Sequence, residues 1–209
     1  MRFTKTLLVT AFLAALPMMA NAESQFSTTV APNTAVARVD FQIVIPRFLY
    51  LRVGAGPVAP AYTPNDITIN LVTFTVPAAN VGSGTAVAGT GGDLGAGAVT
   101  ARLIGNGGPI TLNSLTSGAL SNGLGDSISF AQITNAATVL TAAPLLAHPA
   151  LVDGGTGTTI AVPVTSGTRV TNRDATWTFN YSNSNVVAAG SYGGVGVNNG
   201  RVTYTASML

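Results

Sequence analysis

Cysteine is absent from the 209 residues of this chain, and histidine occurs once, at His148. Without cysteine no disulfide can hold the fold, which must depend on core burial and backbone pairing. Zinc sites draw mainly on His and Cys ligands, so a lone histidine cannot build one. A Ser–His–Asp hydrolase would need His148 as its base, yet no Gly-x-Ser-x-Gly motif offers a nucleophile. We interpret His148 as a structural residue and expect neither enzymatic activity nor a cofactor.

Charged residues are scarce as well. Beyond residue 22 the acids are Glu23 and six aspartates, the bases are seven arginines, and no lysine follows Lys5. A net charge near zero gives no excess of positive charge with which to bind the phosphates of a nucleic acid. The same neutrality permits self-association or contact with related surface subunits, because long-range repulsion is weak.

Three of the aspartates, Asp93, Asp126 and Asp153, stand in glycine-rich contexts. Calcium sites gather several oxygens from one loop or from adjacent loops, and none of the three carries the D-x-[DN]-x-[DN]-G pattern. Aspartates in turns ordinarily bond to nearby backbone N–H groups. Turn chemistry is therefore the favoured interpretation, and calcium binding is the alternative.

The beginning of the chain has the three parts of a secretory signal peptide. Arg2 and Lys5 provide positive charge, an apolar run covers Leu7–Ala20, and Ala20-Asn-Ala22 supplies the small residues that a signal peptidase requires. The apolar run is too short to cross a bilayer comfortably, so we expect no membrane span after cleavage. The sequence predicts removal of residues 1–22 and a secreted chain in the periplasm, at the cell surface or outside the cell.

Alternation of apolar and polar residues marks strands along the mature chain. In the first of them it predicts a core face of Val39, Phe41, Ile43 and Ile45. The other predicted strands are Phe48–Val53, Ile67–Val76, Ala98–Ile104, Ile110–Leu115, Ser127–Ile133, Thr158–Val164, Ala175–Tyr181 and Val202–Met208. No convincing helix separates them. About eight or nine strands joined by turns predict an all-β fold, an antiparallel Ig-like or Greek-key β-sandwich.

We expect one such domain over residues 37–209, preceded by an N-terminal extension over residues 23–36, with Gly82–Gly97 as a loop. The period of two in the last strands predicts a core of Trp177, Phe179, Tyr181, Val202 and Tyr204. Trp177 has a second interpretation, as an exposed aromatic on which a sugar stacks. Its alternation with two further aromatics favours the core.

The C-terminal third resembles bacterial fimbrial and related surface Ig-like domains. The resemblance rests on Asp174–Tyr181, on Val186–Tyr192 with its Ala-Gly-x-Tyr corner, and on the alternating stretch Gly200–Ala206. Gly196 also stands where pilins of the chaperone–usher type carry glycine. The chain departs from that pattern in lacking a cysteine pair and in having Met208 as the penultimate residue. The resemblance implies a surface-structure protein.

These observations predict a non-enzymatic, fimbria-like structural subunit that assembles by strand addition. The candidate assembly segment is Ser24–Ala35, in which Phe26, Thr28 and Val30 alternate; a frayed terminus is the alternative for this stretch. A second function of a different class is a monomeric secreted module that binds carbohydrate or a surface ligand. An exposed Trp177 would favour that module.

The predicted processing can be tested on exported protein. Mass spectrometry should find Glu23 at the N-terminus, because the small residues at positions 20 and 22 direct cleavage after Ala22. An exported product that retains Met1 would contradict the signal-peptide prediction.

Overall fold

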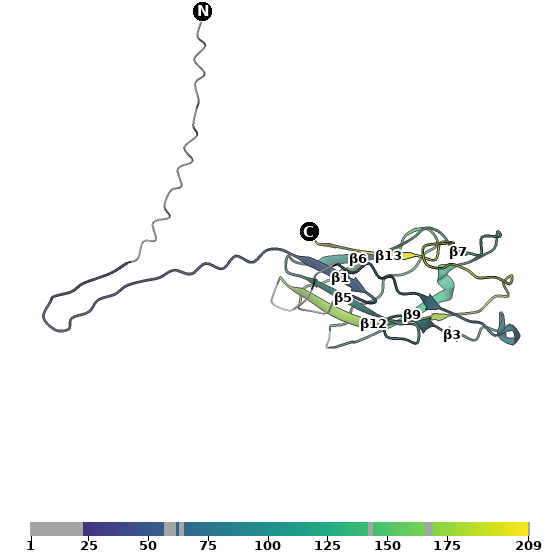
Figure 1. The fold of residues 1–209 in the computed structure, drawn as a ribbon, viewed down its shortest axis with the longest axis horizontal. Coiled ribbons are helices and arrows are strands. Elements are labelled where there is room, and N and C mark those ends of the chain that lie inside the picture. Colours follow the sequence, from purple (N-terminus) through teal and green to yellow (C-terminus); the bar gives the residue numbers. More distant parts are fainter. Residues whose placement is uncertain (1–22, 57–61, 63–64, 142–143, 166–168, 209) are drawn as a thin grey trace, which may run out of the picture. The chain divides into compact units, whose positions relative to one another are not determined.

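The computed structural model describes residues 23–56, 62, 65–141, 144–165 and 169–208, so the predicted signal peptide lies outside the described residues. The chain divides into two units, Met1–Ile45 and Pro46–Leu209. The division falls later than the predicted domain start at residue 37. The second unit is an all-β sandwich of antiparallel sheets (Figure 1).

The first layer is a five-stranded sheet centred on the longest strand of the chain. It consists of β1 (Leu49–Val53), β5 (Ala98–Gly105), β12 (Thr171–Tyr181), β9 (Ile133–Thr138) and β3 (Val87–Ala88). β12 pairs with β5 along most of its length, so that Thr171 is opposite Gly105, and with β9 at its end, so that Tyr181 is opposite Ile133. β1 extends the sheet on the far side of β5.

The second layer is a four-stranded sheet built around β6 (Figure 1). It consists of β6 (Ile110–Thr116), β13 (Val202–Met208), β10 (Gly155–Thr156) and β11 (Ile160–Val162). A glycine-rich turn at residues 105–109 connects β5 of the first layer to β6 of the second. That turn is therefore an arch between the sheets, because β5 and β6 pair with other strands.

Short elements complete the described part of the chain. The two-stranded pairs are β2 (Val72–Thr73) with β4 (Thr90–Gly91) and β7 (Leu120–Ser121) with β8 (Ser127–Ile128); the 3₁₀ turns are η1 (Ala78–Asn80) and η2 (Phe130–Gln132). The predicted loop Gly82–Gly97 thus contains β3 and β4. Within it, a Cβ on Gly89 would come within 2.9 Å of the Gly97 Cα, so this crossing of backbones needs glycine.

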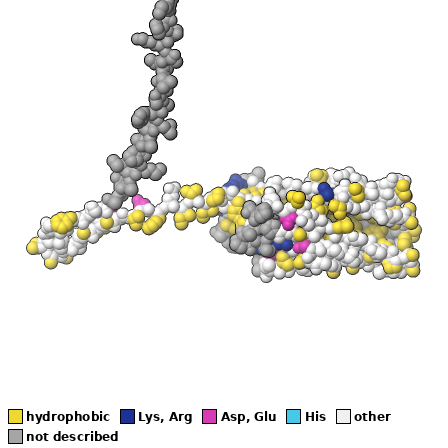
Figure 2. Space-filling model, viewed as in Figure 1, with side chains coloured by type: hydrophobic (Ala, Val, Ile, Leu, Met, Phe, Trp, Pro, Cys, Tyr) yellow, Lys and Arg dark blue, Asp and Glu magenta, His cyan; other side chains and the backbone are white. Residues whose placement is uncertain are grey.

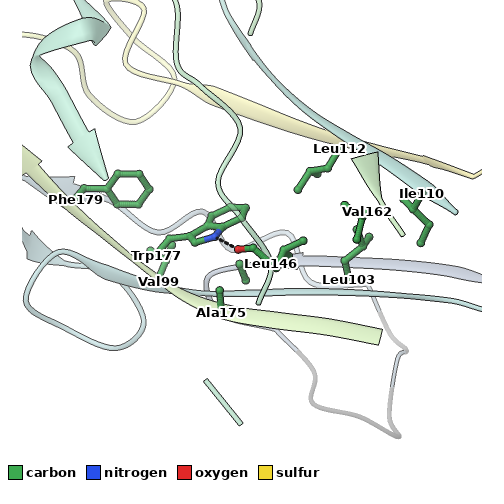
Figure 3. Packing of buried hydrophobic residues seen from close by; sticks show 10 residues of the cluster. Val99, Leu103, Ile110, Leu112, Leu146, Val162, Ala175, Trp177 and Phe179 are labelled. Carbon is green, nitrogen blue, oxygen red and sulfur yellow. Dashed lines mark hydrogen bonds between the residues drawn. The ribbon is translucent and has the colours of Figure 1, made fainter. Parts of the chain in front are cut away.

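The core lies between the two layers and centres on Trp177 of β12, which is fully buried. Leu103 of β5 and Leu112 of β6 belong to the same buried cluster and come from the two sheets (Figure 3). The Trp177 indole N–H donates to the Leu146 carbonyl at 2.9 Å, so the polar atom of this ring is satisfied inside the core. Leu146 comes from the segment between β9 and β10 and is itself buried.

The aromatic residues at the end of β12 are also inside. Phe179 and Tyr181 are buried. Trp177 is itself fully buried, so it is a core residue with no exposed face on which a sugar could stack. Val202 and Tyr204 of β13 are half-buried, in a strand whose alternate residues Thr203 and Thr205 are exposed. The period of two holds along β13, which covers the core from the edge of its sheet.

Three strand predictions are wrong in whole or in part. In the predicted strand Ser127–Ile133 only β8 is a strand before residue 133, because the 3₁₀ turn η2 follows it at Phe130–Gln132. The predicted core face of Val39, Phe41, Ile43 and Ile45 is 71–88% exposed, because no described strand pairs with this stretch. In the predicted strand Ile67–Val76 only β2 is paired, since only there does a partner, β4, lie alongside.

The two faces of β13 can be compared by substitution. Tyr204→Ala should lower the free energy of unfolding by about 3–5 kcal/mol, because it removes a large ring that packs on the core. Thr205→Ala, on the exposed face of the same strand, should change it by about 0.5 kcal/mol or less. Denaturant melts measure both, and equal effects of the two substitutions would contradict this register.

Candidate functional site: an unpaired apolar strand and an open sandwich flank

Residues 39–45 are extended (Figure 1), pair with no strand that the structure describes, and are apolar on one face. The exposed fractions are 88% for Phe41 and 84% for Ile43, and Val39 and Ile45 are also exposed. Figure 2 shows hydrophobic side chains along this N-terminal segment. Such a face ordinarily packs against a core, and large apolar residues exposed together mark a site of interaction.

The preceding stretch folds back on itself. The Arg38 guanidinium forms a bidentate ion pair with Glu23 at 2.8 and 2.9 Å, and the Asn33 side chain donates to the Ser27 carbonyl at 3.0 Å. Bends occupy residues 30–32. The predicted assembly stretch Ser24–Ala35 is therefore bent in its middle, whereas residues 39–45 are extended throughout.

The predicted assembly residues lie in this bent stretch. Phe26 and Val30 are about nine-tenths exposed, at 89% and 94%, and Thr28 is exposed between them. Their side chains are free of the core, but the bend after Val30 limits the length of straight strand that they can offer to a sheet edge.

Asn106 holds the start of the second unit in place. Its side-chain amide donates to the Pro46 carbonyl at 2.8 Å, and its side-chain oxygen accepts from the Phe48 N–H at 2.8 Å. These two bonds fix the backbone that leads into β1. The arch that connects the two layers thus also anchors the chain where the sandwich begins.

The sandwich has one flank at which the core is only partly covered. Among the described residues, β1 pairs only with β5 and β13 pairs only with β6, so each has an edge without a partner strand. Core-facing residues of these two edge strands are half-buried: Leu51, Val53, Tyr204, Ala206 and Met208. An edge strand with free N–H and C=O groups is a template for a further strand.

An aromatic cluster supports β13 from inside. The His148 Nε2 lies 2.7 Å from the Tyr204 hydroxyl, and the His148 ring meets the Trp177 ring edge-on with centroids 4.6 Å apart. Burial lowers the pKa of His148 to about 4, against a smaller opposite effect of the Pro149 backbone. Burial also raises the pKa of Tyr204. His148 is therefore a neutral packing residue at neutral pH.

The three glycine-flanked aspartates hold separate parts of the fold. Asp93 accepts from the Thr100 N–H at 2.8 Å and pairs with Arg52 at 3.3 Å. Asp126 accepts from the Asn122 side chain, and Asp153 accepts from a backbone N–H, that of Phe130. Among the described residues no group of three or more His, Cys, Asp or Glu side chains is arranged to hold a metal ion.

No protein-family model, curated protein or solved structure matches this chain. The described residues contain no helix that is long and apolar enough to cross a membrane. The geometry of the site is therefore the basis on which its function is inferred.

Buried His148 should make stability depend on pH. The imidazole of His148 binds a proton below about pH 6.5 in the unfolded chain but only below about pH 4 in the folded chain. The contribution of neutral His148 to the free energy of unfolding is therefore fully present above pH 6.5 and is lost as the pH falls toward 4. The loss should be on the order of 3 kcal/mol by the size of that shift. Urea melts between pH 7 and 4 measure it. His148→Gln should be less stable at pH 7 and should lose this slope, and an unchanged slope would contradict the assignment.

Proposed function

We propose that this chain is a secreted, fimbria-like structural subunit that assembles by strand addition, with residues 39–45 of one copy pairing along the outer edge of β13 in another. The exposed apolar face of residues 39–45 carries this proposal. Extended segments that add to a sheet edge gain main-chain hydrogen bonds, and their alternate side chains fill core positions.

The two strands match in length and pattern. Residues 39–45 and β13 each contain seven residues, and each has an apolar residue at every second position. A strand placed beside β13 would turn Phe41 and Ile43 toward the half-buried Tyr204 and Ala206. Asp40 and Gln42 would face solvent beside the exposed threonines of β13.

The energy of such pairing is substantial. Burying a Val, Ile or Phe side chain contributes about 1.5–3 kcal/mol, and the segment offers four of them. Part of this gain is offset by the lost freedom of two associating chains. The near-zero charge beyond residue 22 adds little repulsion between copies.

The predicted signal peptide supports an extracellular role. Because the chain has no cysteine, strand pairing and core burial would have to hold both the subunit and the assembly together. Structural subunits need an address and a polymerising contact, and no catalytic group. The half-buried edge and the unpaired strand supply that contact from two different parts of the chain.

Assembly can be tested with paired variants. Phe41→Asp with Ile43→Asp should abolish higher-order species, because two carboxylates would have to enter an apolar flank. The matched control is Gln42→Asp with Val44→Asp, which adds the same charge to the opposite face and should assemble. Size-exclusion chromatography over a concentration series and electron microscopy of mature protein measure the outcome. A wild-type protein that stays monomeric throughout would overturn the proposal.

The acceptor edge can be mapped because the chain has no cysteine of its own. A copy with Gln42→Cys is mixed with copies carrying Thr203→Cys, Thr205→Cys or Ser207→Cys on the exposed face of β13. At least one mixture should give a disulfide-linked dimer on a non-reducing gel. Thr134→Cys on β9 is the control and should give none; equal cross-linking there would exclude β13 as the acceptor.

A further inference from the structure

A second feature, unrelated to strand addition, lies where β12 ends and β9 begins. A hollow of about 290 Å³ opens there between the end of β12, the β8–η2 turn and the residues before β10. Its lining is mostly polar, from Ser127, Gln132, Asp153, Tyr181 and Asn185, with Ile128 as an apolar wall. None of the described arginines lines it.

Two of these side chains are held in place by one atom and free at the other. The Gln132 side-chain oxygen accepts from the Ser184 hydroxyl at 2.7 Å, and one Asp153 oxygen accepts from the Phe130 N–H at 2.6 Å. The Gln132 amide NH₂ and the second Asp153 oxygen make no hydrogen bond to any described residue. The fold thus orients both groups while leaving a donor and an acceptor available.

Tyr181 adds a hydroxyl to the wall of the hollow. The residue is only 6% exposed, yet its hydroxyl makes no hydrogen bond within the described part of the chain. Burial raises the pKa of Tyr181, with a smaller contribution from Tyr192, so the hydroxyl remains a donor at neutral pH. Although the ring is buried, the hydroxyl reaches solvent, so it is available as a donor and an acceptor to a ligand that enters the hollow.

We infer that this hollow binds one residue of a neutral saccharide. A sugar hydroxyl both donates and accepts, which matches a lining that mixes the Asp153 carboxylate with the Gln132 amide and the Tyr181 hydroxyl. The single carboxylate and the absence of a lining cation disfavour an anionic ligand. Ile128 offers an apolar surface to the C–H face of the ring, as small-ligand sites combine apolar walls with a few placed polar groups.

The test uses mature wild-type protein on an array of immobilised neutral glycans, followed by saturation-transfer NMR with free glucose, galactose, mannose and N-acetylglucosamine. At least one of these sugars should bind. Tyr181→Phe keeps the ring and removes the hydroxyl, and Asp153→Asn keeps an acceptor for Phe130, so both should fold. Each should weaken binding at least fivefold, whereas Thr205→Ala on distant β13 should leave it unchanged.

Three results would overturn the inference: no binding to any neutral glycan or free sugar, binding that both pocket variants leave intact, or calcium binding by titration calorimetry that Asp153→Asn removes while no sugar binds. The inference does not rest on assembly. The Phe41→Asp with Ile43→Asp variant, which alters only the N-terminal segment, should bind the same sugar with the same affinity per chain.

Discussion

The burial of the Trp177 indole between the two sheets is the interaction on which the rest of the sandwich depends. Its ring lies in the core against Tyr204 of β13, and its N–H donates to the Leu146 carbonyl inside the core. Two residues further on, His148 packs edge-on against the same ring and reaches the Tyr204 hydroxyl of β13. One side chain thereby ties together the central strand of the first sheet, an irregular segment and the edge strand of the second. In a chain without disulfides, this cluster takes the place of a covalent link between the layers.

The same arrangement leaves the core only partly covered at the edge strand β13. Tyr204 packs against Trp177 with ring centroids 5.2 Å apart, yet its strand ends the sheet and remains half-buried. A core that is complete at its centre and thin at one flank gains most from an added strand at that flank. Residues 39–45 expose an apolar face and pair with no other described strand. The segment and the flank of β13 therefore both have apolar surface that an added strand would cover.

The long strands could be predicted from the sequence because their alternation is set by burial within one chain. β6 alternates buried and exposed residues, and the aromatic residues of β12 are buried as its pattern predicts. Residues 39–45 carry an equally regular pattern, and the prediction that they face a core of their own domain is wrong. Alternation with a period of two predicts that one face of a strand is buried, but it does not show whether the same chain or another copy buries it. The pairing partners of β5 and β6 could not be predicted either, because the same turn residues occur in a hairpin and in an arch between two sheets.

The candidate sites were less accessible to sequence reasoning than the strands. Trp177 has the chemistry of a sugar platform and is a core residue, whereas the hollow that we assign to a sugar uses Gln132 and Asp153, which no motif marks. The glycines beside Asp153 predict a turn residue, and its carboxylate does hold the Phe130 N–H. The second carboxylate oxygen of Asp153 can contribute to a binding site only because the fold places Asp153 and Tyr181 around the same hollow. No sequence pattern predicts that residues of β8, η2 and β12 meet in space, because they are far apart along the chain.

The clamp that Asn106 places on Pro46 and Phe48 has a mechanical consequence. Only residues 46–48 separate the unpaired strand from β1, and both side-chain bonds of Asn106 grip that short connection. Tension applied to the segment along the direction of β1 would load the five residue pairs between β1 and β5 simultaneously, in shear, instead of opening them one after another. Hydrogen bonds loaded in parallel share the force, so a subunit joined at this point would extend little before it yields.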